Sequence, residues 1–107
     1  MPITNITPKE LKARLDQGEL ITVIDVRESW ELAKGRTTFA THIPMDDIPD
    51  RLADIPHDVP VVIMCHLGGR SAQVTAYLNG QGYENVVNLD GGIARWAADV
   101  DPAVNTP

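Results

Sequence analysis

Short apolar segments alternate along the chain with amphipathic ones. Residues 20–26 and 60–65 are continuous apolar runs rich in β-branched side chains, which is typical of strands covered on both faces of a sheet. Residues 84–89 predict a third strand of this kind. Residues 37–43 are also rich in β-formers but are interrupted, which predicts a short strand and a turn.

The amphipathic segments predict helices between these strands. The earliest begins at a capping box, Thr7-Pro8-Lys9-Glu10, with proline at the first helical position, and Gly18 ends it. Later helices are expected over 28–34, 46–55, 70–80 and 91–98. In these helices we expect the inward-facing residues to be Leu52, Ile55, Val74, Tyr77, Leu78 and Trp96.

Alternating strands and helices, with buried strands, indicate an α/β fold: a mostly parallel sheet with helices on both faces. The length fits one domain over residues 1–107, in which 99–107 form an irregular C-terminal tail. Ligands of such sheets bind beyond the carboxyl ends of the strands. The segments 25–28, 65–70 and 90–92 are therefore where we expect the functional residues.

Composition narrows the function. Nine basic against fifteen acidic residues give a net charge of −6, and this argues against nucleic acid or an anionic membrane as partner. No apolar run approaches the ~20 residues of a membrane span, and the N-terminus does not resemble a signal peptide, so we expect a cytoplasmic protein. A single cysteine excludes an internal disulfide framework, and three scattered histidines lack metal-ligand spacing. We expect no metal and no cofactor.

The one cysteine closes the second buried strand and is followed by a compact loop, His66-Leu67-Gly68-Gly69-Arg70-Ser71, and then a helix. Backbone N–H groups of a tight loop can turn toward the sulfur, and the helix N-terminus adds positive potential. The glycine pair permits positive φ and close approach, and Arg70 adds a permanent charge. Each feature favours thiolate over thiol. Cys65 is therefore predicted to be an activated nucleophile facing an anionic substrate.

Other residues near the strand ends have weaker signals. We expect the side chains of His66 and Leu67 to point outward and shape the mouth of the loop; the alternative for His66 is a proton shuttle. Asp25 and Arg27 end the first buried strand, and a structural ion pair is the favoured interpretation. The alternative is functional: Asp25 accepts hydrogen bonds from the loop, and Arg27 pairs with Glu28 or holds the loop.

The loop 65–71 reads Cys-x-x-Gly-x-Arg-Ser, and this motif resembles the active-site loop of the rhodanese-like sulfurtransferase family. Residues 25–28, 35–45 and 82–96 are similar to three further signatures, so the resemblance covers nearly the whole chain. It implies a five-stranded, mostly parallel sheet and a persulfide formed on Cys65. One signature departs from the family: Arg36 stands where histidine is usual, and Phe39 where glycine is usual. We expect Arg36 to add positive charge to the pocket rim.

The resemblance implies a thiosulfate sulfurtransferase. A small sulfur-donor anion such as thiosulfate would load Cys65, and cyanide, a thiol or an acceptor protein would take the sulfur. Two alternatives remain. One is a non-enzymatic sulfur carrier or redox sensor. The other is a cysteine phosphatase or arsenate reductase, whose oxyanion cradle has Cys-x5-Arg spacing, whereas Cys65 and Arg70 form a Cys-x4-Arg loop. The smaller ring fits one sulfur atom better than a phosphate.

Overall fold

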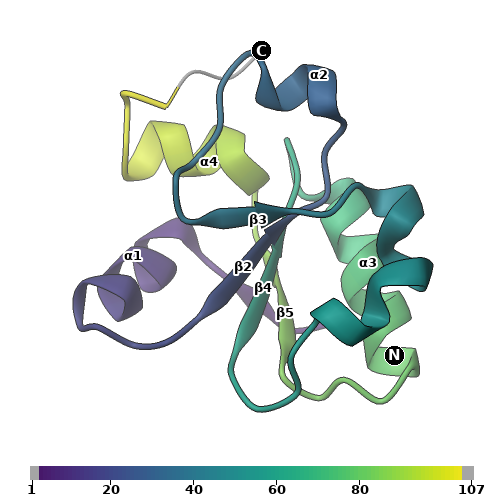
Figure 1. Cartoon of the computed structure of the whole chain (residues 1–107). Helices are drawn as coiled ribbons and strands as arrows, with labels where there is room; N and C mark the ends of the chain where they lie inside the picture. Colours follow the sequence, from purple (N-terminus) through teal and green to yellow (C-terminus); the bar gives the residue numbers. More distant parts are fainter. Residues whose placement is uncertain (1–2, 105–107) are drawn as a thin grey trace.

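The computed structural model describes residues 3–104 and contains one five-stranded sheet (Figure 1). The strands lie in the order β1-β5-β4-β2-β3, and every neighbouring pair is parallel. The expected mostly parallel α/β sheet is thus confirmed, and it has no antiparallel pair among the described residues. The strands are β1 (Asn5–Ile6), β2 (Thr22–Asp25), β3 (Ala40–His42), β4 (Val61–Met64) and β5 (Val86–Leu89).

Helices cover both faces of the sheet, as expected. In Figure 1, α1 and α4 lie on one side of the strands, and α3 lies with the 3₁₀ helix η1 on the other. The short α2 lies near the ends of β2 and β3. The helices are α1 (Pro8–Asp16), α2 (Ser29–Leu32), η1 (Met45–Asp54), α3 (Gly69–Gly80) and α4 (Gly92–Asp99).

Successive side chains of a strand point to opposite faces of the sheet, so each face packs against its helices through its own apolar cluster. Val23 and Val62 belong to the cluster under α1 and α4, which also contains Trp96. Ile24 and Ile63 belong to the cluster under α3 and η1. Burial on both sides explains why the central strands have continuous rather than alternating apolar sequences.

The first helix begins where the sequence predicts, at the capping box of Thr7 and Glu10. The Thr7 hydroxyl accepts from the Glu10 N–H at 3.2 Å, and the Glu10 carboxylate accepts from the Thr7 N–H at 2.9 Å, which completes the predicted capping box. The preceding strand β1 has no counterpart among the apolar segments. It consists of two residues at the sheet edge, too few to produce a period-2 pattern.

Some boundaries and orientations differ from expectation. Tyr77 was predicted to face inward, but 37% of its surface is exposed, whereas Val74 and Leu78 are buried. The segment expected to be helical over 46–55 is a 3₁₀ helix with a kink at Arg51. Of the expected tail, residue 99 ends α4, residues 100–104 carry no regular element, and 105–107 lie outside the described residues.

The topology gathers three strand ends at one edge of the sheet. β4 is central, with β2 on one side and β5 on the other, and Asp25 is in register with Met64. Cys65 therefore emerges beside the segment that follows β2. The longest helix, α3, has 12 residues, so no helix in the described range is long and apolar enough to cross a membrane.

Candidate active site

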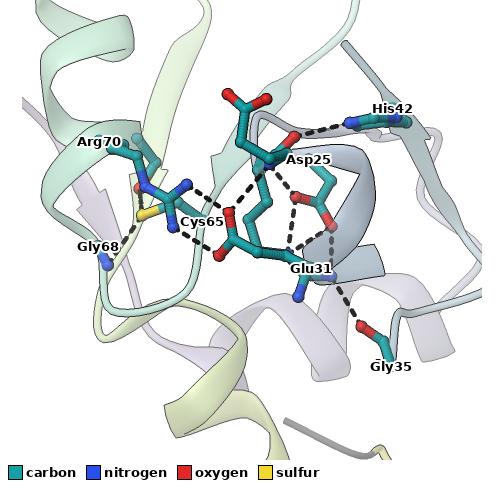
Figure 2. A network of polar contacts seen from close by, with 10 residues as sticks. Asp25, Glu31, Gly35, His42, Cys65, Gly68 and Arg70 are labelled. Carbon is teal, nitrogen blue, oxygen red and sulfur yellow. Dashed lines mark hydrogen bonds and ion pairs between the residues drawn. The ribbon is translucent and has the colours of Figure 1, made fainter. Parts of the chain in front are cut away.

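The sulfur of Cys65 lies at the centre of the loop and receives two hydrogen bonds. The Gly68 N–H donates to Sγ at 3.0 Å, and the Ser71 hydroxyl donates at 3.2 Å (Figure 2 shows the Gly68 contact). Cys65 is only 1% exposed and Ser71 is fully buried. Both donors stabilise negative charge on sulfur more than the neutral thiol, because a hydrogen bond to an ionised acceptor is stronger. The predicted inward N–H cradle is thus present at Gly68, with a hydroxyl adding to it.

Gly68 provides this N–H because of its backbone conformation. Its φ of +107° lies in the region that favours glycine, as the sequence predicted. A Cβ on Gly68 would also lie 3.3 Å from the Gly91 nitrogen. The next glycine differs: Gly69 is the first residue of α3, and a Cβ there would meet nothing within 4 Å. Of this pair, only Gly68 is required to be glycine by geometry.

The N-terminus of α4 holds the other side of the loop. The Ile93 N–H donates to the Cys65 carbonyl at 2.8 Å, and the Ala94 N–H donates to the His66 carbonyl at 3.1 Å. A Cβ on Gly92 would lie 2.4 Å from the His66 oxygen, so glycine is needed for this approach. Segment 90–92 was one of the three in which functional residues were expected. The structure shows that α4 packs there against the cysteine loop and binds two of the loop's carbonyls.

Arg70 ends the loop and pairs with a carboxylate from α2. Its Nη1 and Nη2 donate to Oε1 and Oε2 of Glu31 at 2.6 and 2.8 Å, a two-pronged ion pair (Figure 2). Oε1 also accepts from the Glu28 N–H at 3.0 Å. The Glu31 side chain is 4% exposed and that of Arg70 is 36% exposed. The positive charge on the loop is therefore neutralised from within the protein.

The ion pair changes the titration of both partners. Hydrogen bonding to Arg70 is the main reason why the pKa of Glu31 falls from its ordinary value of 4.5 to about 2, although burial opposes the fall. Glu31 in turn raises the pKa of Arg70, and the charge of nearby Cys65 acts in the same direction. Both groups are thus charged throughout the physiological pH range.

Asp25 and Arg27 form the buried ion pair that the sequence favoured. Arg27 is completely buried, and its Nη2 donates to Asp25 Oδ2 at 2.9 Å and to the Gly35 carbonyl at 3.0 Å. Its own carbonyl contacts His42 Nε2 at 2.7 Å (Figure 2). The alternative pairing of Arg27 with Glu28 is wrong. Arg27 instead binds Asp25, Gly35 and His42, and so holds residues 35 and 42 against the end of β2, beside the loop.

Arg36 is predicted on the rim of the Cys65 pocket, and the structure shows it beside a pocket formed by other segments. Its exposed side chain lines this pocket of about 620 Å³ together with Lys12 of α1 and Trp96 of α4. Phe39, the other departure, lies in the same pocket, with its ring 5.1 Å from that of Trp96. The effect of Arg36 on the Cys65 rim stays a prediction.

Leu67 is 68% exposed, as expected for a residue at the mouth of the loop, whereas His66 is half-buried. One partner of the loop was missed. Glu31 was not singled out, because it lies 39 positions from Arg70 and nothing local links the two. The only signal was its place three residues after Glu28, at the start of a predicted helix.

This arrangement can hold a sulfur nucleophile and a second sulfur bonded to it. Gly68 and Ser71 stabilise the thiolate, the helix α3 begins directly behind it, and α4 fixes the loop backbone. Leu67 gives the entrance an apolar surface. The chemistry available is nucleophilic attack by Cys65 and storage of the transferred atom on its sulfur.

Comparisons with known proteins agree with this geometry. The model of the rhodanese-like domain matches residues 7–99. A sulfurtransferase of Allochromatium vinosum is 42% identical over 102 residues, which cover 95% of each chain. The thiosulfate sulfurtransferase GlpE of Pseudomonas entomophila is 34% identical and covers 85% of this chain and 82% of its own. A rhodanese-like domain protein from Staphylococcus aureus superposes with a TM-score of 0.85 at 35% identity, covering 98% of this chain and 99% of its own.

Proposed function

Because this chain belongs to the rhodanese-like domain family, we propose that it is a sulfurtransferase that works through a persulfide on Cys65. It takes a sulfane sulfur from thiosulfate or a persulfide donor and passes it to a thiophilic acceptor, which is cyanide, a thiol or a protein cysteine. The observation that carries the proposal is the hydrogen-bonded sulfur: the only cysteine of the chain accepts from Gly68 and Ser71 at the start of α3.

The reaction has two halves. In the first, the Cys65 thiolate attacks the outer sulfur of thiosulfate, a new S–S bond forms, and the old S–S bond breaks with its electron pair leaving on sulfite. In the second, the acceptor attacks the outer sulfur of the Cys65 persulfide and the thiolate returns. With cyanide the product is thiocyanate. Charge and atoms balance in each half, and no cofactor is needed.

The residues of the loop have separate tasks in this scheme. Gly68 and Ser71 lower the free energy of the anionic sulfur in the resting enzyme and after the acceptor has taken the sulfur. α4 binds the Cys65 and His66 carbonyls through the Ile93 and Ala94 N–H groups. These contacts fix the loop backbone that presents the sulfur to the donor.

Intact-mass spectrometry tests the proposal. After incubation with thiosulfate or an organic persulfide, the chain should gain the mass of one sulfur atom and lose it on addition of cyanide. Cys65→Ser should gain none while keeping the thermal melting temperature of the wild type within a few degrees. If the wild-type mass never shifts with either donor class, the sulfurtransferase proposal fails. A non-enzymatic carrier would load in the same way but would release its sulfur only to a partner protein and not turn over with cyanide.

A further inference from the structure

The charge that the Cys65 loop offers to a donor is already neutralised. Arg70 is the only lysine or arginine in residues 65–71, and both prongs of its guanidinium are bound to Glu31. Arg27, on the neighbouring strand end, is fully buried and paired with Asp25. An anion that approaches the loop therefore meets ion pairs rather than a free cation.

The neutralising carboxylate is fixed in place. Glu31 is buried, and a second hydrogen bond from the Glu28 N–H holds Oε1. Figure 2 shows the Arg70 guanidinium facing the Glu31 carboxylate, with the Cys65 sulfur on its other side. Arg70 retains further N–H groups that can contact a donor, but its charge is compensated by the buried carboxylate, so the donor meets an ion pair of no net charge.

The charge of the donor then decides how well it is accepted. Thiosulfate carries two negative charges and must approach a thiolate on a protein of net charge −6. An organic persulfide carries less charge on its reacting sulfurs, and it has an apolar portion that can contact the exposed Leu67. We propose that the Glu31–Arg70 ion pair makes this site select organic persulfides over thiosulfate as sulfur donors, and that Glu31 is the positioning residue for this selectivity.

The inference rests on the proposed function and specifies its donor. In the loading step the Cys65 thiolate attacks the outer sulfur of R–S–SH and forms a new S–S bond, the S–S bond of the donor breaks, and R–S⁻ leaves with the electron pair. The proton stays on the outer sulfur, which is now bound to Cys65. Charge is conserved, since one thiolate replaces another, and no oxidant or reductant is consumed.

Two probes that differ in charge test the selectivity: thiosulfate, a dianion, and methanethiosulfonate, a monoanion that delivers its outer sulfur with methanesulfinate as leaving group. Second-order loading rates of Cys65 are measured by intact mass for the wild type, Glu31→Gln and Glu84→Gln. The glutamine at 31 removes the neutralising charge and retains an oxygen for the Glu28 N–H. Glu84 is exposed and precedes β5, at the edge of the sheet opposite Cys65, so Glu84→Gln is a matched control that changes net charge equally and leaves the ion pair intact.

We expect the ratio of thiosulfate to methanethiosulfonate loading to rise about fivefold to tenfold in Glu31→Gln, since one unit charge acting at about 7 Å in a dielectric of about 40 corresponds to roughly sevenfold. The ratio in Glu84→Gln should stay within about twofold of the wild type. An unchanged ratio in Glu31→Gln, with methanethiosulfonate loading intact, would overturn the inference. An equal rise in Glu84→Gln would also overturn it, because net charge alone would explain the effect.

A measurement on the wild type covers the case in which Glu31→Gln does not fold. Potassium chloride screens the repulsion of a dianion, so thiosulfate loading should rise with ionic strength more than methanethiosulfonate loading does. A fall in thiosulfate loading with salt would reveal an attractive free cation and refute the inference. Failure of every donor, organic persulfides included, to load the wild type would instead refute the proposed function itself.

Discussion

Replacing Gly68 by alanine separates the loop geometry from the mere presence of a cysteine. At φ +107° an alanine is strained by roughly 1–2 kcal/mol, and its Cβ lies 3.3 Å from the Gly91 nitrogen. If the backbone keeps its conformation, the strain lowers stability, and the melting temperature of a domain this size falls by about 4–10 °C. If the backbone rotates instead, the Gly68 N–H turns away from Sγ.

Loss of that N–H has its own magnitude. A hydrogen bond to a charged group contributes about 1.5–3 kcal/mol, so thiolate-dependent loading of Cys65 should slow by roughly tenfold to a hundredfold with every donor. Gly69→Ala is the matched control, because a Cβ there meets nothing within 4 Å and its φ is not positive. Loading rates and melting curves of both variants decide the matter. If Gly68→Ala loads and melts like the wild type, the cradle argument is wrong.

Further variants test the contacts around the loop. Gly92→Ala should lower the free energy of unfolding by several kcal/mol and slow the loading of Cys65, because its Cβ would lie 2.4 Å from the His66 oxygen. Gly80→Ala, where a Cβ meets open space, should change neither the melting temperature nor the loading rate. Arg70→Ala should lower the melting temperature and slow loading by both donors, since Arg70 holds Glu31, and should slow thiosulfate more than an organic persulfide, because the uncompensated Glu31 carboxylate repels a dianion more strongly; unchanged loading by both donors would contradict this. Because the pKa of Glu31 is lowered from 4.5 to about 2, its ion pair stabilises the fold fully above about pH 5 and less as pH falls toward 2. The difference in free energy of unfolding between the wild type and Glu31→Gln, at most about 3 kcal/mol above pH 5, should therefore shrink as pH falls. Urea titrations at each pH measure this difference, and a difference that does not change with pH would contradict the role of the ion pair.

The sequence predicts those parts of the site that are contiguous. Residues 65–71 contain the nucleophile, the glycine with positive φ and the hydroxyl that reaches Sγ, so one loop and the helix after it define the cradle. The central strands could also be predicted, because strands that are buried on both faces have continuous apolar sequences. These features depend on local conformation and burial, which the pattern of residues records directly.

The parts that were missed depend on contacts between distant segments. The Glu31–Arg70 pair joins α2 to the loop, and no local pattern reports that α2 packs there. The sequence marked segment 90–92 by its place after a strand, but not the contact of Gly92 with the loop carbonyls, which depends on how α4 packs at the end of β4. The pocket that Arg36 lines is formed by three segments far apart in the chain, so no local pattern reports it.

The most direct test of the account is transfer from an isolated Cys65 persulfide. The wild-type chain is loaded with an organic persulfide, freed of donor by gel filtration, and mixed with cyanide in a single turnover. The account predicts one thiocyanate per loaded chain, a mass lower by one sulfur atom, and a modified peptide that contains Cys65. Sulfur that is found on another residue, or that stays bound to Cys65 when cyanide is added, would contradict the central claim that this cysteine is the carrier of the transferred sulfur.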